Sequence, residues 1–190
     1  MSVFLGVDPG SNGGWAAIDQ DSRFLRGGRW RTSRVQDIVA QLAELKPQVA
    51  MCYLEEVRLF PTQSIGVIIN VGALLINQGI WQGILITLGI PYQEITPNAW
   101  QNQVNLHHWK KHMVGSKRPG VAPNTPLRLA QELWPAAELT KDVEDGLAVA
   151  LILAEVARQD ALNPLKRQVQ QALEVKPKRN RKREGVRYGP

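Results

Sequence analysis

The spacing of apolar residues predicts strands alternating with helices along the chain. A continuous apolar run over 3–8 predicts a buried strand that ends at Asp8, and the Pro-Gly pair after it predicts a turn. Residues 13–31 predict two antiparallel strands joined at Asp19–Ser22. Apolar residues at helical spacing predict a helix over 33–47, and residues 48–56 return to strand character and end in acid.

The segment between Arg58 and Glu94 carries no charged residue and is long enough to span a bilayer. On a helical wheel Gln63, Asn70 and Asn77 nearly align, with Gln78 and Gln82 beside them. Amides in that number would be costly in lipid without partners. The pattern therefore favours a central helix of a water-soluble domain, buried on several faces, and no membrane partner.

Glycines form another side of the same helix, which we expect at about 63–89. Gly72, Gly79 and Gly83 align there and would allow a second helix to approach closely. The approaching helix could come from the same chain or from a second copy.

The rest of the chain alternates in the same way, which predicts an α/β fold. A short strand is expected over 90–95, and a short helix follows with Thr96 as its cap and Pro97 at its first position. Residues 105–124 are basic and broken by glycine and proline, and further helices are expected over 125–135 and 140–159. We predict one domain over 1–160 and a basic tail over 161–190.

The net charge of +6 is concentrated in that tail. From Pro164 onward there are nine basic and two acidic residues, whereas the remainder of the chain carries −1. Such a tail is typically disordered when free and can bind phosphate backbones, although a solvated solubility tail or a localisation signal has the same composition. The DNA-binding candidates are Lys178, Arg179, Arg181, Lys182 and Arg183.

Cys52 is the only cysteine, and its strand-like surroundings predict a buried core thiol. A lone cysteine fits a reducing compartment, and no secretory signal is evident. We therefore expect a cytoplasmic protein.

Acidic residues end two predicted strands and open the last predicted helix. Asp8 and Glu55 close strands, while the i, i+3 spacing of Asp142 and Asp145 puts both on one helix face. Acids in a first helical turn are ordinary cap and dipole residues, so neither aspartate is informative alone. Four carboxylates together would repel each other without cations, and oxygen ligands suit Mg²⁺ or Mn²⁺. Two such ions can activate water for phosphodiester hydrolysis.

Three motifs, "LGVDPGSNGGWAAI", "YLEEV" and "DVEDGLAVALILA", resemble in this order the acidic motifs of the RuvC-type Holliday junction resolvases. The resemblance covers the chain from about Val3 to Ala157 by order of elements. It implies a ribonuclease H-like mixed sheet flanked by helices. It also implies a metal-dependent endonuclease that cleaves Holliday junctions and other branched DNA.

The resemblance assigns roles to individual residues. Asp8, Glu55, Asp142 and Asp145 match the metal ligands and catalytic acids, with two Mg²⁺ or Mn²⁺ ions per site. The long helix matches the element through which family members form homodimers. Arg58 stands near the place of an aromatic residue that stacks at the junction in several members, and Phe60 follows it. The basic tail and the 107–120 segment are less typical of cellular members and suggest a phage branch. The resemblance therefore implies that the expected cytoplasm is that of a bacterium or a phage-infected cell.

The basic segment after the short helix has two interpretations. His107, His108 and His112 could suggest zinc, but no cysteine or acid lies nearby to complete a tetrahedral set. A DNA-facing loop fits better, with a stacking aromatic residue among phosphate-binding cations. Its candidates are Trp109, Lys110, Lys111, Lys117 and Arg118.

Other functions remain open at this point. A different ribonuclease H-like nuclease would cut RNA–DNA hybrids or flaps, and the residues do not report substrate choice. An actin-like ATPase has phosphate loops similar to "DPGSNGG", but it needs two large lobes and this chain is short. A non-enzymatic DNA-binding protein would leave the aligned acids unexplained.

Overall fold

A computed structural model of the chain describes residues 1–58, 65–104, 125–139 and 145–163, with side chains from 71, 126 and 146 onward in the last three ranges. Its centre is a five-stranded mixed sheet in the order β3-β2-β1-β4-β5. β1 is antiparallel to β2 and parallel to β4. The strand bounds are β1 Val3–Asp8, β2 Gly14–Asp19, β3 Phe24–Arg29, β4 Val49–Glu55 and β5 Tyr92–Ile95.

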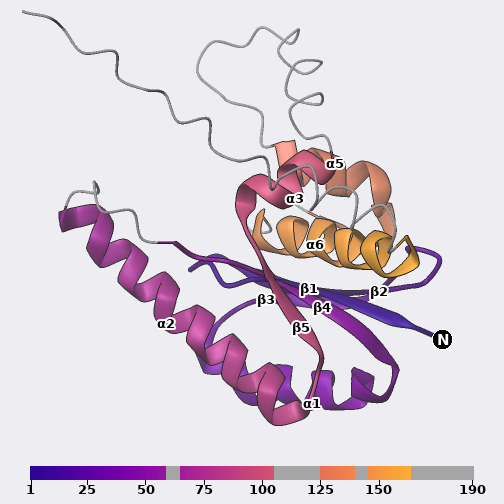
Figure 1. Ribbon diagram of the computed structural model, residues 1–190, viewed down its shortest axis with the longest axis horizontal. Helices are drawn as coiled ribbons and strands as arrows, with labels where there is room; N and C mark the ends of the chain where they lie inside the picture. Colours follow the sequence, from indigo (N-terminus) through magenta and orange to yellow (C-terminus); the bar gives the residue numbers. More distant parts are fainter. Residues whose placement is uncertain (59–64, 105–124, 140–144, 164–190) are drawn as a thin grey trace, which may run out of the picture.

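Helices cover both faces of the sheet, as Figure 1 shows. On one side lie α1 and α2, and on the other lie α3, α5 and α6. The helix bounds are α1 Val35–Leu45, α2 Ile65–Leu88, α3 Pro97–Gln103, α5 Thr125–Leu133 and α6 Asp145–Leu162. Short 3-10 turns lie at Thr32–Arg34, Lys46–Gln48 and Pro135–Ala137.

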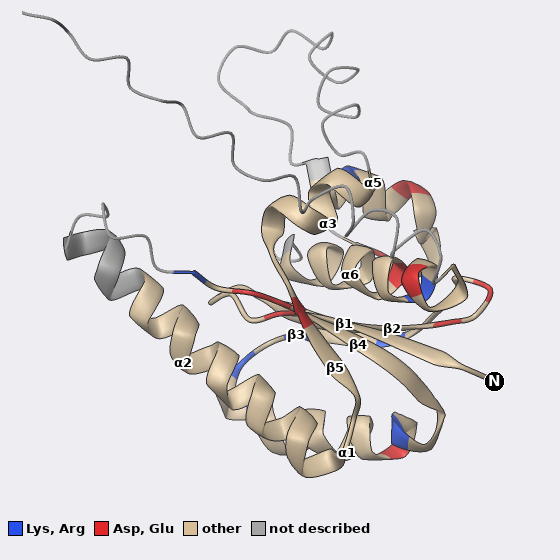
Figure 2. Ribbon diagram, in the orientation of Figure 1, with Lys and Arg blue, Asp and Glu red and all other residues tan. Residues whose placement is uncertain are grey.

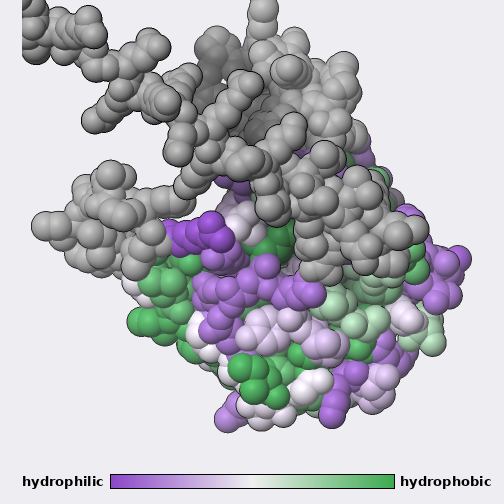
Figure 3. Space-filling view, viewed as in Figure 1, coloured by the Kyte–Doolittle hydropathy of each residue, from purple (hydrophilic) through white to green (hydrophobic). Residues whose placement is uncertain are grey.

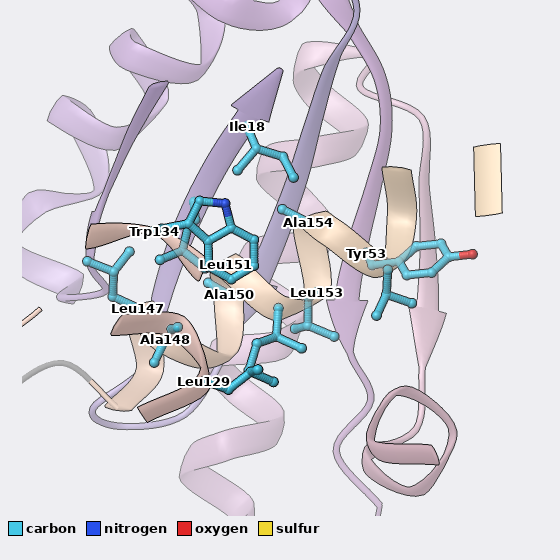
Figure 4. Close-up of a cluster of buried hydrophobic side chains, with 14 of the residues drawn as sticks. Ile18, Tyr53, Leu129, Trp134, Leu147, Ala148, Ala150, Leu151, Leu153 and Ala154 are labelled. Atoms are coloured by element: carbon cyan, nitrogen blue, oxygen red, sulfur yellow. The ribbon is translucent and has the colours of Figure 1, made fainter. Parts of the chain in front are cut away.

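The apolar helix α6 lies directly on the central strands because glycines leave room for it. A Cβ atom on Gly6 would lie 1.9 Å from the backbone oxygen of Ala150, and one on Gly14 would lie 2.7 Å from the nitrogen of Leu147. The side chains of α6 then fill the core together with residues such as Ile18 and Trp134 (Figure 4). This packing fixes where α6 begins relative to the end of β1.

The opposite face buries only one side of α2, which corrects the prediction of a helix buried on several faces. Trp81 and Leu85 are fully buried, whereas Ile76 and Ile86 are 67% and 66% exposed. Figure 3 shows hydrophobic residues at the surface along the edge that α2 forms. By length and composition, Val71–Leu88 is also the one stretch in the described part of the chain that could cross a membrane, and 22% of it is buried.

The remaining elements confirm the predictions closely. The hairpin turns after Asp19, Thr96 caps α3 through a 3.2 Å hydrogen bond from the Ala99 amide, and Cys52 is fully buried, which raises the pKa of its thiol. The tail was predicted to begin at 161, but α6 continues to Leu162; residues 164–190 lie outside the described residues.

Candidate active site

Asp8 and Glu55 lie side by side at the ends of adjacent strands. β1 and β4 run parallel with Val7 opposite Leu54, so the next residue on each strand emerges at the same edge of the sheet. Figure 2 shows acidic positions on the strands where the sheet passes between α2 and the layer of α3 and α6. The predicted pairing of these two carboxylates is therefore present in the fold.

The turn after β1 fixes the carboxylate of Asp8. The backbone N–H of Gly10 donates a 2.7 Å hydrogen bond to Oδ1 of Asp8. A Cβ atom at Gly10 would lie 2.9 Å from the same oxygen. The Asp-Pro-Gly sequence thus forms a local turn in which an amide orients the carboxylate.

Glu55 is held by an aromatic side chain from α3. The indole Nε1–H of Trp100 donates a 2.8 Å hydrogen bond to Oε1 of Glu55, and Trp100 is itself buried. Burial and the nearby charge of Asp8 raise the pKa of Glu55 from its ordinary 4.5 to about 7, and the hydrogen bond from Trp100 opposes that rise. Two carboxylates thus face each other in a site that disfavours two negative charges.

The first turn of α6 lies against the loop that follows Asp8. Gly13 and Gly146 form an isolated parallel bridge, and a Cβ atom on Gly146 would lie 2.3 Å from the backbone oxygen of Asn12. Asp145, the residue before Gly146, is the first residue of α6. Its backbone therefore lies beside the turn of Asp8, while its side chain and all of Asp142 lie outside the described part of the chain.

A divalent cation fits the donors that are described. Asp8 and Glu55 offer carboxylate oxygens, the ligand type that Mg²⁺ and Mn²⁺ prefer. A cation would offset both causes that raise the pKa of Glu55, its burial and the charge of Asp8. Within the described ranges, no group of three or more His, Cys, Asp or Glu residues gathers in a way that could hold a metal. Further ligands to a cation would have to come from outside the described residues, such as Asp142 and the side chain of Asp145.

Most of the other residues that were predicted to contact DNA lie outside the described part of the chain. Arg58 is described, and its guanidinium pairs with the carboxylate of Glu56 through bonds of 2.7 and 2.8 Å. Two of its N–H groups, on Nε and Nη2, are thus already engaged by a neighbour. The candidates outside the described residues are Phe60, Trp109, Lys110, Lys111, Lys117, Arg118, Lys178, Arg179, Arg181, Lys182 and Arg183, together with the three histidines.

Trp100 is the site residue that the sequence patterns did not single out. It lies in the predicted short helix, whose cap and first proline were recognised, but nothing in that helix points to an acid forty-five positions earlier in the chain. The available signal was indirect: Trp100 is the one bulky aromatic residue in a helix that directly follows β5, the neighbour of β4.

Comparison with known proteins supports the fold. No family model and no curated protein matches the sequence. Among solved structures, "T. thermophilus RuvC in complex with Holliday junction substrate" matches with a TM-score of 0.51 and 19% identity, over 81% of this chain and 90% of that one. A second Thermus thermophilus RuvC structure matches with a TM-score of 0.50 and 19% identity, over 86% of this chain and 96% of that one. The chain therefore has a ribonuclease H-like fold similar to that of RuvC.

Proposed function

We propose that this protein is a structure-selective endonuclease that cleaves Holliday junctions and other branched DNA by Mg²⁺-dependent phosphodiester hydrolysis. The observation that carries the proposal is the adjacency of Asp8 and Glu55 at one sheet edge, with the first turn of α6 held against the same loop. A solved structure of similar fold holds a Holliday junction, which supports this choice of substrate. The order of the three acidic motifs adds independent support.

The chain's own residues would prepare the site for cations. Asp8, Glu55, Asp142 and Asp145 are the proposed ligands. Gly10 and Trp100 each donate a hydrogen bond to one carboxylate oxygen and so limit the rotation of Asp8 and Glu55. When bound, two Mg²⁺ or Mn²⁺ ions would supply water activation and stabilisation of the leaving oxygen. Because the pKa of Glu55 is raised to about 7, part of the population carries a proton on Glu55 near that pH, and cation binding would release it.

We further propose that α2 forms a homodimer. Its exposed side carries Gly72, Ile76, Gly79, Gly83 and Ile86 at helical spacing, and a Cβ atom on any of the three glycines would meet nothing within 4 Å. Beside this stripe, α1 and α2 enclose an apolar hollow of about 270 Å³. Exposed apolar surface in this arrangement favours close packing of a second α2, and a two-fold dimer would present two sites to the two strands of a junction.

The exposed side of α2 is less suited to contact with a lipid bilayer than to packing against a second α2. The buried side of α2 contributes Trp81 and Leu85 to the core, and Gln78 accepts a 2.9 Å hydrogen bond from the Val57 amide. A helix that packs on the protein core through one side in this way cannot be surrounded by lipid.

The deciding experiment compares several nucleic-acid substrates and several variants of the acidic residues. Labelled four-way junction, duplex, flap and RNA–DNA hybrid are incubated with the protein, with and without Mg²⁺. We expect Mg²⁺-dependent cleavage of the junction, and we expect Asp8→Asn, Glu55→Gln, Asp142→Asn and Asp145→Asn to abolish it while junction binding persists.

Glu56→Gln serves as the matched control, because Glu56 pairs with Arg58 rather than with the Asp8 site. Its cleavage rate should stay near that of the unaltered protein. Preferential cleavage of RNA–DNA hybrid would instead favour the alternative nuclease, and near-normal turnover by Asp8→Asn would overturn the mechanism.

A further inference from the structure

A polar hollow of about 520 Å³ lies at the turn that follows Asp8, on the α2 side of the sheet, and is not used by the acids. It is lined by residues from three elements: Ser11, Trp30, Arg31, Thr32, Ser33 and Asn77. Ser11 follows the turn that orients Asp8, the middle four residues lead into α1, and Asn77 comes from α2. The lining offers hydroxyls, an amide and a guanidinium, and it includes no carboxylate.

A backbone hydrogen bond connects the wall of the hollow to the loop that follows Asp8. The backbone N–H of Trp30 donates a 2.8 Å hydrogen bond to the oxygen of Gly13. The Trp30 ring is buried against Trp81 of α2, with ring centroids 5.0 Å apart. The wall of the hollow therefore keeps a fixed position relative to Asp8.

The charge of this region is positive and largely uncompensated. Arg31 is exposed and forms no ion pair with any described residue. Nearby, Nε of Arg29 is buried and has no hydrogen-bond partner among the described residues, while its Nη2 lies 3.4 Å from Oδ1 of Asn12. Figure 2 shows the basic segment where the chain leaves β3 and passes towards α1. A guanidinium next to hydroxyl and amide donors is the donor set that recognises a phosphate.

We infer that this hollow binds one backbone phosphate of the DNA strand, next to the phosphodiester held at Asp8 and Glu55. The inference rests on the proposed function and adds a subsite that positions the strand without reading its bases. Arg31 supplies the charge, and Thr32, Ser33 and Asn77 supply uncharged hydrogen-bond donors. The acids at the sheet edge repel DNA on their own, so a fixed cation beside them sets where the backbone runs.

The test uses the full-length protein and three arginine variants. Arg31→Ala should weaken junction binding in the absence of divalent cations and reduce the slope of log affinity against log salt by about one. Cleavage should require more substrate for half-saturation, with the saturated rate nearly unchanged. Arg34→Ala removes a neighbouring exposed charge outside the hollow, and Arg26→Ala removes one already paired with Glu44. Both controls should change the salt slope less than Arg31→Ala.

Single methylphosphonate substitutions in the junction locate the contact. The unaltered protein should lose affinity at one position beside the cleavage point, and Arg31→Ala should lose nothing further at that position. Equal salt slopes for Arg31→Ala and Arg34→Ala in a protein that cleaves junctions would overturn the inference alone. Absence of junction binding and cleavage by the unaltered protein would overturn the proposed function instead.

Inorganic phosphate distinguishes the source of the ligand. If it stabilises the protein against heat through Arg31 while the DNA salt slope stays unchanged in Arg31→Ala, the hollow is a free-phosphate site and the inference is wrong. The expected result is that phosphate competes weakly with DNA and that the competition disappears in Arg31→Ala.

Discussion

The indole of Trp100 donates a 2.8 Å hydrogen bond to the carboxylate of Glu55, joining the helix after β5 to the acid that ends β4. The two residues are brought together because β4 and β5 are parallel neighbours, with Glu55 opposite Ile95. The bond engages one carboxylate oxygen and opposes the rise in the pKa of Glu55. Trp100 is therefore a positioning residue of the site.

Replacing Trp100 by Phe should weaken cation binding at the site without leaving a large cavity in the core. The ring stays large and apolar, but the donor is lost, so the pKa of Glu55 should rise further. Partners of this kind typically contribute about tenfold or more to metal affinity or activity, so we expect a loss of that order in Mg²⁺-limited cleavage. A Mg²⁺ titration of the cleavage rate measures it.

Trp134→Phe is the matched control. It deletes an indole hydrogen bond of the same 2.8 Å length, which here goes to the backbone oxygen of Ser22. Its Mg²⁺ dependence should be normal even if its stability falls. Similar Mg²⁺ dependence in both variants would show that Trp100 acts only through packing.

The Glu55→Gln variant should lose activity and gain stability. Folding raises the pKa of Glu55 from 4.5 to about 7, so the metal-free native state keeps a proton that the unfolded chain releases. Native stability is therefore highest, for this group, below pH 4.5 and falls as pH rises through about 7. Above that range Glu55→Gln should be more stable by up to about 3 kcal/mol. Urea unfolding in EDTA at several pH values tests this, and an equal pH slope for both proteins would contradict it.

Cation affinity should depend on pH through the same group. Since Glu55 must lose its proton to bind a cation, Mg²⁺ should bind roughly tenfold more tightly at about pH 8 than at about pH 6. Calorimetry or thermal shift with Mg²⁺ measures the change. Glu55→Gln should flatten the dependence, and unaltered pH dependence in that variant would assign the titration to another residue.

The patterns that predicted the fold were local, and the features they missed depend on contacts between distant elements. The end of β1 at Asp8 and the Pro97 start of α3 follow from their own neighbours in sequence. The one-sided burial of α2 could not be predicted, because the helix carries no charged residue and its amides do not mark the exposed side: Gln78 is buried, whereas Ile76 and Ile86 are exposed. The bond between Trp100 and Glu55 depends on strand order, which periodicity does not report.

The basic tail, from Lys176 to Arg187, should add affinity without contributing to chemistry. Seven basic residues and one acid lie in that stretch. If about five of them neutralise phosphates, truncation after Glu174 should flatten the salt slope on duplex arms by roughly four to five. Cleavage at low salt and saturating protein should persist, because no proposed metal ligand lies beyond Asp145. An unchanged slope would show that the tail is only solvated.

The last prediction concerns the exposed glycines of α2. Because a Cβ atom on Gly79 or Gly83 would meet nothing within 4 Å, Gly79→Leu and Gly83→Leu should fold normally as single chains, and helix propensity alone favours them by up to about 1 kcal/mol. In a dimer packed through this face, the added side chains would hold the two helices apart. We expect light scattering to show dimers of the unaltered protein at micromolar concentration and monomers of both variants, with thermal stability read by circular dichroism at low concentration. Ala43→Leu places the same leucine side chain at an exposed position of α1 and should leave the dimer intact. A stable monomer of the unaltered protein, or dimers of both variants, would show that α2 does not form the interface.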